Sequence, residues 1–352
     1  MKKTVALFFG GVSPEYSVSL VSAGVIARNI DQEKYNVIYV GITKEGKWYR
    51  YYGIPENIGD GTWCEDESMI KTVNLSMDRS APGIVEYEGS SFTITHIDCA
   101  FPVMHGKNGE DGTFQGALAL AGIPMVGCGV MASAVGMDKF RAHELAKASG
   151  IAVPLGKRVC SPYDLEECTT FAQKIGYPLF VKPIKAGSSY GITHVQKADE
   201  LKDAINEALK YDDEVIIEQA VNDGYEVGCA ILGNDELMFG EVDAVPLSDG
   251  FRDFNMKYVS KASAFQVPAD FSPELTKRIK ETAKRLYLIL GCRGYARIDM
   301  FLNKDGNILF NEVNTIPGFS EHGRYPRMMN AAGLSYAQIV DRLIALALEG
   351  SD

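Results

Sequence analysis

The chain contains 352 residues with a mass of 38.5 kDa, a length that predicts two or three domains rather than one hydrophobic core. Apolar residues make up 46% of the chain and charged residues 23%, which is usual for a globular protein and excludes the disordered and fibrous classes. The formal net charge of −11 at pH 7 argues against nucleic acid or an anionic membrane as the main partner.

The seven cysteines are scattered and form no C-x-x-C pair. This spacing excludes a zinc cage recognisable from sequence and argues against a disulfide framework, so it indicates a reducing compartment. No apolar run approaches the length of a membrane span. We therefore expect a cytoplasmic protein that does not bind membranes.

The first segment predicts a strand, a turn, a helix and a second strand. Residues 4–9 are mostly apolar and predict a buried strand, Gly10-Gly11 predicts a turn, residues 18–29 a helix and residues 37–42 the next strand. This order is typical of a parallel sheet.

Another apolar strand is predicted at 97–103. It leads into a Gly-rich loop at 105–112 and a helix at 113–121. Residues 122–129 are expected to end the first domain.

The remaining chain predicts a helix at 138–149 and strands at 179–183 and 214–219. Residues 247–262 show little periodicity, and a loop of this length within a compact protein is usually a functional lid. We expect a mixed α/β fold with an N-terminal α/β domain at 1–129, a central domain at 130–216 and a C-terminal, metal-binding domain with the lid at 217–352.

The most informative stretch reads as a hairpin, with two alternating runs around Asp305-Gly306, a strong turn signal. If these are the two turn residues, Asp299 lies opposite Glu312 and Arg297 lies opposite Asn314. The period of a strand then places all four side chains on one face. Such a face is costly to bury unless a ligand neutralises it, and hard oxygen ligands fit magnesium that carries nucleotide phosphates. The alternative is an exposed face with a surface ion pair.

Three weaker patterns also suggest a nucleotide site. Lys182 on a predicted strand precedes a Gly-Ser loop at 185–191, which resembles a phosphate cradle, although most such loops are only turns. Residues 218–221 read as a strand edge that could bond an adenine, and Glu226 could accept from ribose hydroxyls. The alternative for Glu226 is a solvated loop carboxylate.

Two residues near the first domain's loops are candidates for the substrate. Glu15 follows the first turn and suits an ammonium group, while strand–Gly–helix turns in general bind anions. His105 lies in the Gly-rich loop, and a surface histidine is an equal interpretation of it.

Taken together, the motifs resemble the D-alanine–D-alanine ligase family over essentially the whole chain. The motifs are Gly10-Gly11, Glu15, Val18-Ser19-Leu20, His105-Gly106, Glu110-Asp111-Gly112, Met137-Asp138-Lys139, Val181-Lys182-Pro183, Gly187-Ser188-Ser189, Arg297-Ile298-Asp299, Asn311-Glu312-Val313-Asn314 and Pro317-Gly318.

The resemblance implies a three-domain ATP-grasp fold and an ATP-dependent ligase that activates D-alanine as an acyl phosphate. It also implies a homodimer, two magnesium ions with manganese as a substitute, and activation by potassium. The small-molecule substrates would be ATP, D-alanine and a second D-amino acid, with no nucleic acid partner.

The resemblance also implies roles for individual residues. The nucleotide would be bound by Lys139, Phe180, Lys182, Ser188, Ser189, Glu218, Gln219, Ala220, Val221, Glu226, Phe251, Lys257, Asn311 and Glu312. The metals would be bound by Asp299, Glu312 and Asn314. Substrate binding and catalysis would use Glu15, His105, Ser188, Tyr258, Arg297, Gly318, Gly323 and Arg324, with Glu15 on the first ammonium and Arg297 and Gly318 on the oxyanion.

Two segments bear on the second substrate. Dipeptide-forming members of the family carry Lys-Tyr where Lys257-Tyr258 stands, whereas a His replaces this Tyr in vancomycin-resistance members that make D-alanine–D-lactate. Tyr258 is neutral at pH 7 and does not repel an ammonium group, so an amino acid is favoured over a hydroxy acid.

Arg324 stands where housekeeping members carry an apolar residue, and Arg324-Tyr325-Pro326 resembles the vancomycin-resistance branch. Its donors could bond a hydroxymethyl group, which favours D-serine. Gly323 replaces the Ser that holds the second carboxylate in the family, and this leaves that carboxylate to Arg324, Lys257 or backbone groups.

Three alternatives remain. The chain could be a housekeeping D-alanine–D-alanine ligase, an ATP-grasp ligase for other acids, or, from another class, a nucleotide-binding regulator with an inactive site. The intact motif residues argue against the last of these: Lys139, Lys182, Asp299, Glu312 and Asn314.

Overall fold

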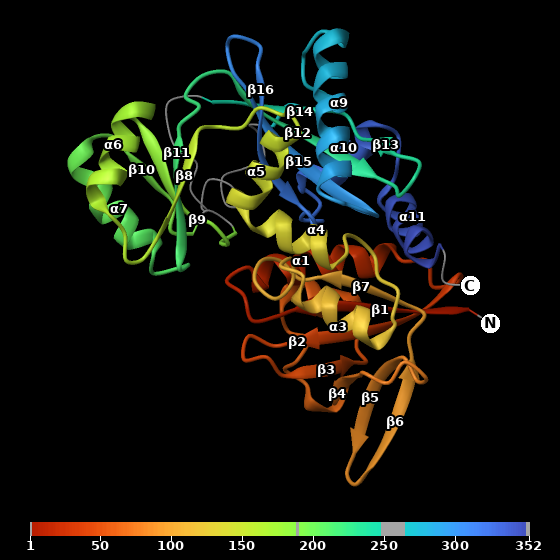
Figure 1. Cartoon of the computed structure of the whole chain (residues 1–352). Coiled ribbons are helices and arrows are strands. Elements are labelled where there is room, and N and C mark those ends of the chain that lie inside the picture. Colours follow the sequence, from red (N-terminus) through yellow and green to blue (C-terminus); the bar gives the residue numbers. More distant parts are fainter. Residues whose placement is uncertain (1, 188–189, 248–264, 350–352) are drawn as a thin grey trace.

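The computed structural model describes residues 2–187, 190–247 and 265–349. Figure 1 shows three lobes, each built around its own sheet. The N-terminal lobe lies below the other two in this view, with the small central lobe at the upper left.

The N-terminal lobe contains a seven-stranded sheet in the order β6-β5-β4-β3-β2-β1-β7. Strand β1 is parallel to β2 and β7, and the other neighbouring pairs are antiparallel. The strands are β1 (Lys3–Gly10), β2 (Tyr35–Ile42), β3 (Trp48–Tyr51), β4 (Ile70–Ser76), β5 (Gly83–Glu88), β6 (Ser91–His96) and β7 (Cys99–Val103), and the helices are α1 (Tyr16–Asn29), α2 (Pro55–Asp60), α3 (Thr113–Ala121) and the short 3₁₀ turn η1 (Glu67–Met69).

These elements follow the hydrophobic pattern of the sequence. The apolar run after Lys3 is buried on both faces of β1, as expected of a parallel strand covered on both sides. Gly10 ends β1 with a φ of 85°, and a Cβ there would lie 2.0 Å from the Ile42 carbonyl oxygen. Glycine is therefore required where the chain leaves β1 and turns toward α1. Helix α1 begins two residues before the predicted helix.

The central lobe contains a four-stranded antiparallel sheet in the order β10-β9-β11-β8. One cluster of buried apolar residues joins this sheet to α6 and α7. The elements are β8 (Gly156–Cys160), α6 (Leu165–Ile175), β9 (Leu179–Pro183), β10 (Thr193–Val195), η2 (Ala198–Glu200), α7 (Leu201–Ala208) and β11 (Glu214–Gln219). The boundary predicted after residue 216 divides β11, so we propose that the central lobe ends after Gln219.

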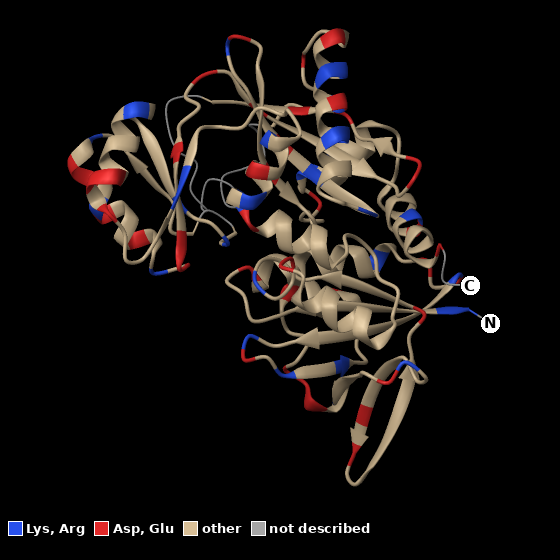
Figure 2. Cartoon of the chain, viewed as in Figure 1, with Lys and Arg blue, Asp and Glu red and all other residues tan. Residues whose placement is uncertain are grey.

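The C-terminal lobe contains a five-stranded antiparallel sheet in the order β13-β12-β15-β16, with β14 also paired to β12. Helices α4, α5 and α9 share a buried apolar cluster with this sheet, so we propose that residues 130–148, expected at the start of the central domain, belong to the C-terminal lobe. The elements are α4 (Val130–Met137), α5 (Lys139–Ala148), β12 (Tyr225–Leu232), β13 (Met238–Phe239), β14 (Asp243–Pro246), α9 (Pro273–Ile289), β15 (Tyr295–Leu302), β16 (Ile308–Asn314), α10 (Arg324–Ala331) and α11 (Tyr336–Leu348). Figure 2 shows acidic and basic positions interleaved along α9.

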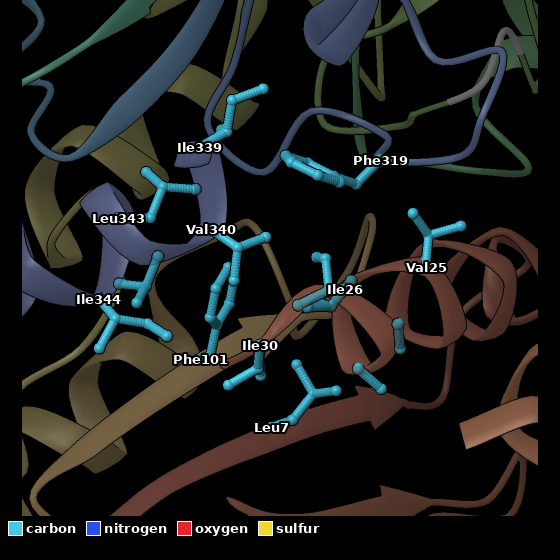
Figure 3. Close-up of a cluster of buried hydrophobic side chains, with 14 of the residues drawn as sticks. Leu7, Val25, Ile26, Ile30, Phe101, Phe319, Ile339, Val340, Leu343 and Ile344 are labelled. Atoms are coloured by element: carbon cyan, nitrogen blue, oxygen red, sulfur yellow. The ribbon is translucent and has the colours of Figure 1, made fainter. Parts of the chain in front are cut away.

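The C-terminal helix joins the two larger lobes. Figure 3 shows Val340 and Leu343 of α11 beside Phe101 of β7 and Ile26 of α1, within one buried apolar cluster. In the part of the chain described here, no single helix is long and apolar enough to cross a membrane, and only the bent pair α10 and α11 meets that length and composition jointly.

Candidate active site

The hairpin of β15 and β16 has the register predicted from its alternation. Asp299 pairs with Glu312 and Arg297 pairs with Asn314. The predicted two-residue turn is wrong, because Asn303 N donates to Asn307 O at 3.1 Å and three residues, 304–306, form the turn. An additional residue, Asn311, between Glu312 and the next paired position of β16 compensates for the longer turn.

The polar face of this hairpin is enclosed, which excludes the alternative of an exposed surface ion pair. Asp299 is 1% exposed. Arg297 donates to both of its oxygens, from Nε at 2.8 Å and from Nη2 at 2.7 Å, and Asn314 Nδ2 donates to Asp299 Oδ2 at 3.0 Å. Burial opposes the guanidinium charge, but the adjacent Asp299 outweighs this effect and raises the pKa of Arg297.

Two lysines face carboxylates beside this hairpin. Lys139 begins α5 behind its N-cap Asp138, and its Nζ lies 3.7 Å from Glu312 Oε2 and donates to Ala186 O at 2.9 Å. Lys182 on β9 is buried and donates to Glu218 Oε1 on β11. Lys139 thus lies beside the hairpin, and Lys182 of the central lobe is linked to it through Glu218 and His143.

The stretch expected to bind adenine lies at the end of β11. The expectation of a free strand edge is wrong for Glu218 and Gln219, because β11 pairs with β9 on one side and β8 on the other, and Gln219 N donates to Leu155 O. The strand ends there, and Ala220 and Val221 follow it. Phe180 of β9, the predicted apolar wall, stacks on His194 with 4.6 Å between ring centroids.

Two residues predicted for different ligands bond each other. Arg324 Nη1 donates to Glu226 Oε1 at 2.5 Å, while Arg324 Nε and Nη2 donate to the two oxygens of Asp243 at 2.7 and 2.8 Å. Asp243 is fully buried. Arg324 Nη1 also lies 3.7 Å from Asp299 Oδ2, so the guanidinium borders the hairpin's polar face.

Gly323 has a steric reason to replace Ser. It is the N-cap of α10, and a Cβ there would lie 2.6 Å from Gly318 O and 3.0 Å from Ser320 O. Since real Cβ atoms almost never approach oxygen this closely, a side chain at 323 would displace the loop that contains Gly318.

Glu15 lies where loops from two lobes meet. It is 8% exposed, and a Cβ built on Gly106 or on Gly187 would lie 2.3 or 2.7 Å from its Oε2. Glycine at these two positions therefore lets the Gly-rich loop and the Gly-Ser loop approach the carboxylate closely.

Glu110 connects the N-terminal lobe to the loop before Gly318. Its Oε2 accepts from Gly106 N at 2.9 Å and its Oε1 accepts from Ile316 N at 3.0 Å. Desolvation, followed by the charge of Glu15, raises the pKa of Glu110 to about 8.

The interpretation of His105 as a surface residue is wrong. The ring is 4% exposed, and its Nε2 lies 3.3 Å from Ser22 Oγ, which in turn accepts from Phe319 N at 3.1 Å. Burial lowers the pKa of His105 to about 4, so the imidazole is neutral at pH 7 and supports the loop around Gly318.

Several predicted site residues lie outside the described part of the chain: Ser188, Ser189, Phe251, Lys257 and Tyr258. Residues 248–262 of the predicted lid lie outside it as well.

Sequence reasoning missed two buried residues beside the site. Asp243 stands alone among apolar residues in the segment Val242-Asp243-Ala244-Val245, and a lone charge in such a run could have been noticed. His143 shows no metal-ligand spacing in the sequence, yet it is buried between the central and C-terminal sheets.

Two family models together match most of the chain. The model of the D-alanine–D-alanine ligase N-terminus matches residues 4–128, and that of the C-terminus matches residues 145–345. The chain belongs to the D-alanine–D-alanine ligase family. It is an ATP-dependent ligase that joins D-alanine to a second substrate, of either the vancomycin-resistance or the housekeeping type.

Relatives of this ligase include both types. It is 46% identical over 98% of both chains to the vancomycin/teicoplanin A-type resistance protein VanA of Enterococcus faecium. It is 44% identical over 99% of its length, and 96% of the relative's, to the D-alanine–D-alanine ligase of Caldicellulosiruptor bescii.

The solved structures confirm the expected ATP-grasp fold. The VanG D-Ala:D-Ser ligase of Enterococcus faecalis superposes with a TM-score of 0.91 at 48% identity, covering 99% of this chain and all of that one.

Ligases of this family use ATP with Mg²⁺, and the hairpin fits such a group. Asp299 and Glu312 are paired carboxylates on one enclosed face, and the side-chain oxygen of Asn314 is a third hard donor of the kind magnesium prefers. Among the residues with described positions, no group of three or more His, Cys, Asp or Glu residues could hold a metal ion, so the hairpin offers two carboxylates and an amide rather than a full carboxylate cluster.

Proposed function

We propose that this enzyme is a D-alanine–D-serine ligase that works through a D-alanyl phosphate, supplies modified peptidoglycan precursors in the cytoplasm and confers vancomycin resistance. The observation that carries the choice of D-serine is the position of Arg324, which Asp243 and Glu226 hold beside Asp299. The similarity to a D-Ala:D-Ser ligase at 48% identity supports the same choice.

The geometry of Arg324 suits a hydroxyl group. Three of its five N–H groups donate to Asp243 and Glu226. One of the other two is on Nη1, which also lies 3.7 Å from Asp299 Oδ2, and we assign the remaining donors to a hydroxymethyl group, which a methyl group could not replace as an acceptor. Because the guanidinium is already fixed, little further ordering accompanies binding.

The catalytic roles follow from charge. Transfer of a phosphoryl group to a carboxylate brings negative groups together, and catalysis depends on positioning and electrostatic stabilisation. We assign Lys139 and Lys182 to the phosphates and Arg297 with the Gly318 backbone to the oxyanion. Asp299, Glu312 and Asn314 would bind two Mg²⁺ ions, or Mn²⁺ in their place, which would offset the phosphate charge.

The other roles are proposals of the same kind. Glu15 binds the first ammonium group, with Ser188 and Tyr258 as its partners. Phe180, Glu218 and the residues after it hold adenine. Glu226 reaches the ribose only by sharing its carboxylate with Arg324. A homodimer and activation by potassium complete the proposal.

A competition assay tests the acceptor. With labelled D-serine and D-alanine at equal concentration, we expect D-serine to be incorporated roughly ten- to a hundredfold more, since an unpaired buried donor costs about 1–3 kcal/mol. Arg324→Leu should shift the product ratio toward D-alanine. Arg327→Leu, on the same helix, is the matched control and should leave the ratio unchanged.

The opposite product ratio has a clear meaning. If the wild-type enzyme makes mainly D-alanyl-D-alanine, the serine assignment is wrong. The enzyme is then a housekeeping ligase, the alternative that the Caldicellulosiruptor bescii relative supports.

Binding of the first D-alanine should release a proton. The charge of Glu15 helps to raise the pKa of Glu110 to about 8, and an ammonium group beside Glu15 offsets that charge and favours the ionised form of Glu110. D-Alanine affinity should therefore increase with pH up to about 8, by at most about tenfold per pH unit. Calorimetry in buffers of different ionisation enthalpy measures the released proton, and Glu110→Gln should abolish it. Proton-neutral binding near pH 7 would contradict the assignment.

A further inference from the structure

The additional residue in β16 decides which side chains face the metal site. Asn311 has no partner on β15, since Asp299 pairs with Glu312 and Met300 pairs with Phe310. Such a bulge changes which face of the sheet the following residues occupy. Given the three-residue turn, a regular ladder would place Asn311 opposite Asp299 and would move Glu312 opposite Ile298, on the apolar face.

The carbonyl of Asn311 is hydrogen-bonded to helix α5 of the same lobe. His143 Nε2 lies 2.7 Å from Asn311 O. Because a carbonyl only accepts, Nε2 carries the proton. The ring is 4% exposed and stacks edge-on against Phe310, with 5.5 Å between centroids. The donor is therefore held in place from two sides.

The other ring nitrogen faces the central lobe. His143 Nδ1 lies 3.8 Å from Glu218 Oε2, and the other oxygen of Glu218 accepts from Lys182. Helix α5 thus connects the bulge of the hairpin to the buried Lys182–Glu218 pair. It also begins with Lys139, which lies 3.7 Å from Glu312 Oε2.

We propose that His143 is a positioning residue for the metal ligand Glu312. By donating to Asn311 O, it stabilises the bulge that keeps Glu312 opposite Asp299. The proposal rests on the proposed function of Asp299 and Glu312 as metal ligands. A half-buried carbonyl without this donor favours rearrangement of the bulge, and loss of a group that orients a metal ligand typically lowers metal affinity about 10- to 100-fold.

Three substitutions of His143 distinguish the effect of its hydrogen-bond donor from the effect of the size of its ring. His143→Phe keeps the contact with Phe310 and removes both nitrogens. His143→Gln places an amide N–H near the position of Nε2, and His143→Asn places one near Nδ1 only. His96→Phe, on exposed β6, is the control for a histidine far from the site.

The measurement is ADP binding by calorimetry with and without Mg²⁺, together with thermal unfolding. For His143→Phe we expect the gain in ADP affinity on adding Mg²⁺ to fall by about 10- to 100-fold, with magnesium-free affinity unchanged. His143→Gln should restore most of the gain, whereas His143→Asn should not. If His143→Phe does not fold, the comparison of Gln with Asn still decides.

Other outcomes overturn the proposal in distinguishable ways. Equal magnesium responses of the Gln and Asn variants would show that the donor to Asn311 has no role. An equal loss of ADP affinity without Mg²⁺ would show that His143 only supports the nucleotide pocket through Glu218. A wild-type enzyme without any magnesium response would refute the metal assignment as well, whereas the choice of D-serine is tested separately by the product ratio.

Discussion

Glu312→Gln is expected to fold normally and to lose nearly all ATP turnover. Glu312 lies opposite Asp299 and 3.7 Å from Lys139. Its side chain is 27% exposed, so neutralising it should leave the core intact. Removing one hard anionic ligand should cost several kcal/mol of transition-state stabilisation, and about 4 kcal/mol corresponds to a roughly thousandfold lower rate.

The measurement is D-alanine-dependent phosphate release at an ordinary and at a raised Mg²⁺ concentration. Glu241→Gln is the matched control, since Glu241 is similarly exposed and pairs with Lys280 at 3.3 Å away from the hairpin. Near wild-type turnover of Glu312→Gln at ordinary Mg²⁺ would show that Glu312 is not a metal ligand.

Removal of the Asp243 carboxylate is expected to destabilise the C-terminal lobe. Asp243 is fully buried, and its two carboxylate oxygens accept hydrogen bonds from Arg324. Loss of one partner of a buried ion pair typically costs about 3–5 kcal/mol. Since Glu226 still pairs with Arg324 at 2.5 Å, we expect Asp243→Ala to cost about 3 kcal/mol, near the lower end of that range.

A double-mutant cycle measures this pair. The denaturant midpoints of Asp243→Ala, Arg324→Met and the double variant are compared with that of the wild-type enzyme. The double variant should be more stable than the sum of the single effects predicts, because neither charge is left buried alone. Additive effects within about 0.5 kcal/mol would show that the two side chains do not stabilise each other.

Local patterns predicted which residues of the hairpin pair, but they did not predict its three-residue turn or its bulge. The alternation in β15 and β16 correctly placed Asp299 opposite Glu312. It did so although the turn is one residue longer than expected, because the bulge at Asn311 shifts the register back. The carbonyl of the bulged residue Asn311 bonds His143 of another helix, and a strand's own sequence carries no sign of such a distant partner.

The partners of charged residues could not be predicted for the same reason. Arg324 bonds Asp243 and Glu226, which lie 81 and 98 positions earlier in the chain. The strand at 214–219 was expected to present an edge, yet both of its sides are paired. Local composition cannot distinguish an edge strand from a central one, because the neighbouring strands come from distant segments.

The sequence alone determined the α/β class, the motifs of the D-alanine–D-alanine ligase family and the face that carries Arg297, Asp299, Glu312 and Asn314. These properties depend on period, composition and the order of short motifs, which are local. Only the tertiary structure decided that His105 is buried, that Glu15 lies beside Gly106 and Gly187, and that Arg324 is held by carboxylates. Burial and ion pairing depend on which distant segments meet, and that is decided when the three lobes pack together.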